Sequence, residues 1–168
     1  MHNFYNLNPD QNKKASDSIN TVTLDVNVPL DNPNFHELFN TYCNNPDIEM
    51  QNKLGAYLNT INYLICILPD SVEDSHSTPH TLTIKKDDNL SFLISSTKER
   101  EVYLPIFTDS SQIPLWYTDP VYTLSVPAVW LWKFVLSQKN YQGVVINPGS
   151  IEWSITLEHI QSLLDDLN

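Results

Sequence analysis

The chain has 168 residues, and its 9 Lys and Arg against 20 Asp and Glu give a formal net charge of −11 at pH 7. This negative charge disfavours nucleic acid and anionic membrane as partners, because both are polyanions. Hydrophobic residues make up 41% of the chain, which is enough for one domain with a buried core. Its apolar runs are shorter than the roughly 20 residues of a membrane-spanning helix, and its first residues lack the features of a signal peptide. We therefore expect a cytoplasmic protein.

Residues 1–32 are rich in Asn, Asp, Ser and Lys. They contain one short apolar alternation, at Val22, Leu24, Val26 and Val28, which is compatible with an edge strand. The polar composition around it favours a flexible N-terminal leader instead. The folded domain is then predicted to cover residues 33–168.

Two amphipathic helices are expected to follow this leader. Asn32 is placed to cap the first helix and Pro33 to occupy its first position, and Asn45-Pro46 marks its end. The second helix begins near Asp47. Apolar residues recur at helical spacing in both helices, so each is expected to pack one face against a sheet.

Strands are predicted at 63–68, 81–85, 90–95 and 101–107. The polar turn at 86–89 favours a hairpin between the second and third of them, and hence antiparallel order. A polar loop is expected at 70–80. The fold class that this order indicates is α+β, a single domain in which helices pack on a mixed, largely antiparallel β-sheet.

The last third of the chain alternates between helices and strands. A short helix is expected after Thr108 or Asp109, either of which is suited to cap it. A strand at 121–126 leads into a helix at 127–136 that is apolar on nearly every side and must therefore be buried. The apolar strand 144–146 is typical of one buried on both faces. A final amphipathic helix is predicted at 156–167, with Ser154 or Thr156 as its cap.

The order of these last elements carries a family resemblance. The run Tyr103-Leu104-Pro105-Ile106-Phe107-Thr108-Asp109, the buried helix, the run Gly143-Val144-Val145-Ile146-Asn147-Pro148 and the final helix resemble the N-terminal domain of the bacterial SseB family, named for an enhanced serine sensitivity phenotype. The resemblance implies a mixed α and β domain in a cytoplasmic bacterial protein, with no established reaction and no agreed catalytic residues. Some members carry a second domain, and we expect this chain to be a stand-alone version of the module.

Recognisable catalytic chemistry is missing from the sequence. It has no GxSxG elbow, Walker loop or GxGxxG motif, and three glycines are too few for a phosphate-binding loop. The histidines and the two cysteines lack the spacing of metal ligands, and Cys66 lies in an apolar run typical of the core. We expect no catalytic residues, no metal and no cofactor.

Two polar turns are candidate binding features, because loops at the carboxyl ends of buried strands often line ligand crevices. One contains Thr108 and Asp109, and the other contains Asn147. A structural interpretation competes with this: a helix cap at the first turn, and at the second a backbone shaped by Pro148 and by a positive φ at Gly149.

Aromatic residues next to turns are the remaining signal. Trp116, Tyr117 and Trp153 are candidates for an exposed patch that anchors a protein partner. The leading hypothesis is a non-enzymatic protein-binding module with an accessory or immunity-like role, its partner a basic protein. The alternative is a small-molecule-binding protein or enzyme that uses a crevice between the turns Phe107–Asp109 and Asn147–Gly149. The sequence indicates no particular oligomeric state.

Overall fold

The structure is a computed structural model, and it describes residues 21–72, 78–85 and 88–167. The four α-helices of this part are α1 (Asn34–Asn44), α2 (Ile48–Leu58), α3 (Ala128–Ser137) and α4 (Leu157–Asp165). Its strands are β1 (Thr21–Asp25), β2 (Asn62–Ile67), β3 (Thr81–Lys85), β4 (Ser95–Ser96), β5 (Val102–Ile106), β6 (Tyr122–Pro127), β7 (Gly143–Ile146) and β8 (Trp153–Thr156). Short 3₁₀ helices span Pro69–Ser71 and Ser110–Leu115. None of the described helices is both long enough and apolar enough to cross a membrane.

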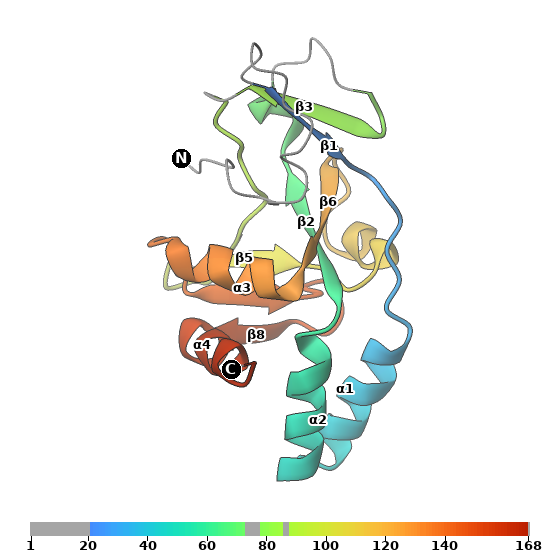
Figure 1. Ribbon diagram of the computed structural model, residues 1–168, viewed down its shortest axis with the longest axis vertical. Helices are drawn as coiled ribbons and strands as arrows, with labels where there is room; N and C mark the ends of the chain where they lie inside the picture. Colours follow the sequence, from blue (N-terminus) through green and yellow to red (C-terminus); the bar gives the residue numbers. More distant parts are fainter. Residues whose placement is uncertain (1–20, 73–77, 86–87, 168) are drawn as a thin grey trace.

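The predicted α+β class is confirmed. Four strands form a sheet in the order β4-β5-β7-β8, in which only the β5–β7 pair is parallel, while β2 pairs with β6 and β1 with β3, both antiparallel. Two hydrogen bonds between the backbones of Leu64 and Phe107, at 2.9 and 3.0 Å, join β2 to the end of β5. The β2–β6 ribbon thereby links the four-stranded sheet to the β1–β3 pair (Figure 1).

Helix α3 lies in the core, as its apolar sequence predicts. Leu131, Trp132 and Val135 have no exposed surface. The indole N–H of Trp132 donates to Asn59 Oδ1 at 2.9 Å, which satisfies the one polar atom of that buried side chain. Helices α3 and α4 pack against each other and against β7.

The start of α1 differs from the prediction. Pro33 is the N-cap residue, and the Asn32 side chain does not cap the helix. Its amide instead donates to Asn62 O at 3.1 Å and to Thr108 O at 2.6 Å, so Asn32 ties the entry of α1 to β2 and to the turn after β5. α2 begins where it was predicted, just after Asp47, and the structure shows that Asp47 caps it, because Asp47 Oδ1 accepts a hydrogen bond from the backbone of Met50 at 2.7 Å.

The flexible leader predicted for residues 1–32 is wrong for its last part. Residues 21–25 form β1, which pairs with β3, and both Leu24 and Val26 are buried in the core. The apolar alternation therefore marks an edge strand after all. Residues 1–20 lie outside the described part of the chain.

The predicted hairpin between 81–85 and 90–95 is also wrong. β3 pairs with β1, and the segment after it runs beside β2, where Leu68 N bonds Ser91 O at 2.8 Å and Leu93 N bonds Cys66 O at 2.9 Å. Phe92 and Leu93 are both buried, so the segment lacks the two-sided alternation of a regular strand.

The sequence prediction missed β8. This strand pairs antiparallel with β7 and forms an edge of the four-stranded sheet. It leads directly into α4, whose predicted cap is confirmed at Thr156, because Thr156 Oγ1 accepts from His159 N at 3.4 Å.

Candidate functional site

The two polar turns singled out in the sequence lie side by side. β5 and β7 are parallel neighbours, so their carboxyl ends, which lead into Thr108 and Asn147, meet at one edge of the sheet. Asn147 Oδ1 accepts from Thr108 N at 3.0 Å, and Asn147 Nδ2 donates to Thr108 Oγ1 at 2.8 Å. Both side chains have no exposed surface.

Asp109 extends this network toward α1. Its carboxylate accepts from Asn32 N at 3.0 Å and from Thr108 Oγ1 at 2.5 Å, and His36 Nε2 lies 3.4 Å from Oδ2. Burial raises the pKa of Asp109, but the hydrogen bonds from Thr108 and Asn32 outweigh it and hold the pKa below the ordinary value. We call Asn32, Thr108, Asp109 and Asn147 the polar turn cluster.

The polar turn cluster is built like a structural element. Its members use their polar atoms on one another, which is what buried polar groups require for stability. His36 and the Thr108 hydroxyl contact the same carboxylate oxygen of Asp109, so the carboxylate lies between them. In a nucleophile-base-acid triad the imidazole would lie in the middle, so His36 is not placed to activate Thr108.

The second turn is shaped differently from the prediction. The positive φ, 47°, belongs to Asn147 and not to Gly149. Gly149 is required for another reason: a Cβ there would lie 2.6 Å from the carbonyl carbon of Leu115, so the turn packs directly against the end of the 3₁₀ helix. Asp109 is the N-cap residue of that helix, but its side chain does not bond into it.

The candidate aromatic residues fall into two places. Trp116 and Tyr117 are half-buried beside each other, with ring centroids 6.4 Å apart, and Trp116 packs on Phe107 at 6.3 Å. Trp153 lies elsewhere, with its ring 5.0 Å from that of Phe39 in α1. The three residues therefore do not form one patch, and only Trp153 borders a cavity described below.

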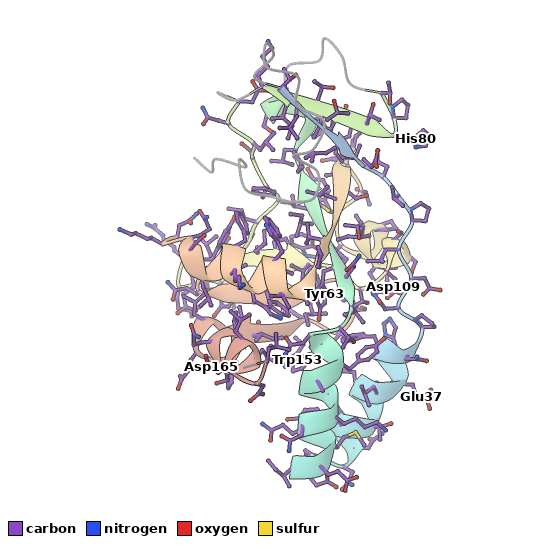
Figure 2. All side chains as sticks on the ribbon, in the orientation of Figure 1. Glu37, Tyr63, His80, Asp109, Trp153 and Asp165 are labelled. Atoms are coloured by element: carbon purple, nitrogen blue, oxygen red, sulfur yellow. The ribbon has the colours of Figure 1, made fainter. Side chains whose placement is uncertain are left out.

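A groove separates the α1–α2 pair from β8 and α4, and Trp153 lies between these two walls (Figure 2). Its volume is about 280 Å³. We call it the α2–α4 groove. Its lining residues are Tyr42 from α1; Gln51, Asn52, Leu54, Gly55 and Leu58 from α2; Trp153, Ser154 and Ile155 from β8; and His159, Ser162, Leu163 and Asp166 from α4 and its end.

The two walls of the groove are fixed to each other at one end. Asn59 Nδ2, just after α2, donates to Leu163 O near the end of α4 at 2.7 Å. The two helices are close at Gly55, where an added Cβ would lie in ordinary van der Waals contact, 3.6 Å from Leu163 Cδ2. Along α4 the lining residues recur at the spacing of a single helix face, so one side of this helix is directed to the groove.

Charge around the groove is negative. Among the described residues that line it there is no Lys or Arg, and Asp166 is the one acidic side chain. Asp165 precedes it at the end of α4, whose last turn contains no basic residue. A helix C-terminus carries a partial negative charge, so acidic residues there are electrostatically unfavourable. Lys53 follows the lining residue Asn52, but helical geometry places it on the opposite face of α2.

Other reactive groups give little support for catalysis. Burial raises the pKa of the Cys66 thiol to about 12, so this cysteine stays protonated and unreactive. Within residues 21–72, 78–85 and 88–167, no three His, Cys, Asp or Glu side chains are grouped so that they could hold a metal ion. His76 lies outside the described residues.

The α2–α4 groove was not predicted as a site. Trp153 was the only one of its lining residues among the candidates. Two further signals were present in the sequence: a glycine inside α2 at Gly55, and the acidic pair Asp165-Asp166 at a helix end. Each has a common structural explanation alone, and only the structure brings them together.

Fold and site together define a small α+β domain with a satisfied polar cluster at one sheet edge and an open, acidic groove beside another strand. The chain belongs to the SseB family: the family described as SseB protein N-terminal domain matches residues 40–161. The matched region contains α2 and β8, so it includes parts of both walls of the groove. Comparison with curated proteins and with solved structures found no match.

Proposed function

We propose that this protein is a non-enzymatic protein-binding module that takes a basic segment of a partner protein into the α2–α4 groove. The observation that carries the proposal is the groove itself, an opening lined by both apolar and polar side chains, with Asp166 among them, on a strongly acidic protein. An accessory or immunity-like role against a basic protein partner fits this arrangement.

The apolar part of the groove supplies a place for an anchoring side chain. Leu54 and Leu58 from α2, Ile155 from β8 and Leu163 from α4 line it. Removing apolar surface from water contributes roughly 25 cal/mol per Å². The volume of about 280 Å³ lies near the lower limit of about 300 Å³ for small-molecule pockets. Such a space suits one or two side chains of a larger partner better than a complete cofactor.

The charge of the groove selects the partner. A Lys or Arg beside Asp166 would offset the unfavourable acidic pair at the end of α4. The net charge of −11 also accelerates encounter with a basic protein through long-range attraction. The same charge disfavours a second copy of this chain as the occupant.

The alternative, a small-molecule site or an enzyme in the crevice between Phe107–Asp109 and Asn147–Gly149, has weaker support. The polar atoms at this point are already bonded to one another. A ligand would have to replace these buried hydrogen bonds, and leaving even one unmade costs about 1–3 kcal/mol.

The groove is tested with peptides selected on the protein from a random 12-residue phage library. We expect the selected peptides to share a Lys or Arg next to apolar residues. Ser162→Trp fills the groove and should weaken their binding at least about 10-fold. Gln161→Trp is the matched control, because it adds the same ring on the opposite face of α4 and should leave binding unchanged.

A second pair of variants tests the charge. Asp166→Lys should weaken the same peptides about 5- to 10-fold, whereas Asp165→Lys makes the same change in net charge beside the groove and should have a smaller effect. Isothermal titration calorimetry measures both pairs. Selection of no related peptides, or equal loss of affinity in each variant and its control, contradicts the proposal.

A further inference from the structure

We propose that the bound segment is extended and adds a strand to β8, pairing with the backbone of Ser154. This inference rests on the proposed binding in the α2–α4 groove and specifies how the segment is held there. In the described part of the chain β8 has a strand neighbour on one side only, β7. Its residues Trp153, Ser154 and Ile155 line the groove, so the unpaired side of the sheet and the cavity adjoin.

A hydrogen bond at the end of β7 shows to which side each of its residues directs its backbone N–H and C=O groups. Asn147 N donates to Ile106 O in β5 at 3.0 Å. Successive residues of a strand present their N–H and C=O groups alternately to the two sides. Within β7, Val145 therefore faces β5, whereas Val144 and Ile146 face β8.

The register then fixes the orientation of β8. Val144 is paired with Ile155, and Ile146 with Trp153, so these residues direct their backbone groups to β7. The hydrogen bond from Leu157 N to Gln142 O, at 3.1 Å, continues the same alternation. Ser154 therefore points its N–H and C=O away from β7, where the described residues place no hydrogen-bond partner for them.

Ser154 can thus bind one residue of an extended segment through two backbone hydrogen bonds. The side chain of Ser154 is exposed, and those of Trp153 and Ile155 lie on the other face of the strand, toward the groove. In the added strand, the residue opposite Ser154 points outward and its two neighbours point into the groove. Both neighbours would contact the groove lining, which includes Leu163 and Asp166.

Features that usually protect an edge strand are only partly present in β8. The strand is short, which limits unspecific pairing, but its four residues Trp-Ser-Ile-Thr include no lysine and no proline. A basic occupant is favoured over a second copy of this chain, because two chains that each carry −11 repel each other. The pairing and the charge together define the partner as an extended, basic, partly apolar segment.

The test is a backbone scan of the best peptide selected from the phage library. Each N–H in turn is removed, once by N-methylation and once by replacing the amide with an ester, which adds no methyl group. We expect one sensitive position, with at least about a 10-fold loss of affinity in both forms, and tolerance at the adjacent positions. Alanine substitutions should cost most at the two neighbours of that position. A helical peptide would instead be sensitive at several consecutive positions.

A pair of protein variants gives the reciprocal test. Ser154→Pro removes the outward N–H, while Ser154→Ala keeps it and removes only the hydroxyl. We expect a loss of at least about 10-fold for the first variant and little change for the second, with thermal unfolding used to verify that both are folded. If all backbone changes in the peptide are tolerated while Ser162→Trp still abolishes binding, strand addition is wrong and the groove stands. If Ser162→Trp has no effect, the groove itself is wrong.

Discussion

The polar turn cluster and the α2–α4 groove contain similar polar residue types but use them in opposite ways. In the cluster, the amides of Asn32 and Asn147 and the carboxylate of Asp109 are buried and bonded to partners far away in sequence. In the groove, Asp166 and Ser162 are exposed beside apolar lining residues such as Leu163. Buried and satisfied polar groups specify a fold, whereas exposed ones next to apolar surface are available to a partner.

This difference has a measurable consequence. Changes in the polar turn cluster should lower the free energy of unfolding and leave peptide affinity in the folded protein unchanged. Changes on the groove wall should lower peptide affinity without lowering the free energy of unfolding. A variant of one region that produces the effect assigned to the other would break the distinction.

Asn147→Ala is expected to have the largest effect. It removes both hydrogen bonds to Thr108 and leaves alanine, which has a Cβ but no polar side chain, at φ 47°. An unsatisfied buried N–H costs about 1–3 kcal/mol and a left-handed backbone about 1–2 kcal/mol, so we expect a loss of about 3 kcal/mol in urea unfolding. Asn147→Gly is the control, since it tolerates the positive φ and should lose only the part due to the hydrogen bonds. Equal stability of the two variants would contradict the backbone contribution.

Asp109→Asn is expected to cost about 2 kcal/mol at neutral pH, because hydrogen bonds to a charged group are each stronger than neutral ones. The folded state lowers the pKa of Asp109, so its stabilisation is complete above the pKa of the unfolded chain and is lost as the pH falls through the lower folded value. The wild type should therefore lose stability below about pH 4 more steeply than Asp109→Asn.

Asp31→Asn is the matched control for this pH dependence. The pKa of Asp31 is raised, first by its hydrogen bond with Asp109, so the linkage has the opposite sign. Removing Asp31 should make the acid loss of stability steeper, and removing Asp109 should make it shallower. Unfolding curves recorded in urea between pH 3 and 7 distinguish the two, and parallel slopes in all three proteins would refute the assigned roles.

How far the sequence predicts these two regions depends on the distance over which their parts interact. The start of α2 near Asp47 and the cap of α4 at Thr156 were predicted correctly, because each depends on residues within three positions. Asn32 was placed correctly next to a helix but given the wrong partner, since its amide bonds Thr108, 76 residues later. The pairing of β1 with β3 was not predicted, for the same reason. The composition around residues 21–25 is polar, and the strand with which they pair lies about 60 residues away.

The groove was beyond sequence reasoning for a different reason. It is the space left where α2 and α4 meet, and no property of either helix alone predicts its width. The apolar faces of both helices were predicted, yet Leu54 and Leu163 are needed partly for the core and partly for the cavity wall. The polar turns were found because they are local, but whether their side chains face a ligand or each other depends on the parallel register of β5 and β7.

Gly55→Ala should have the smallest effect and is the most direct comparison within the groove. Glycine inside a helix costs roughly 0.5–1 kcal/mol relative to alanine. If the fold does not need glycine here, replacing it with alanine should therefore stabilise the protein by about that amount. The added Cβ would lie 3.6 Å from Leu163 Cδ2, an ordinary contact that causes no strain. We therefore expect a rise in the free energy of unfolding of about 0.5–1 kcal/mol. Ala56 occupies the next, exposed position of α2, and Ala56→Gly should lose a similar amount of stability, which calibrates the helix propensity at this site.

Because the methyl group narrows the groove between α2 and α4, Gly55→Ala should also weaken the binding of the selected peptides about 2- to 3-fold, while Ala56→Gly leaves their affinity unchanged. Gain of stability with loss of binding in one substitution would identify Gly55 as a residue kept for the width of the groove, and gain of stability with full binding would place the peptide elsewhere.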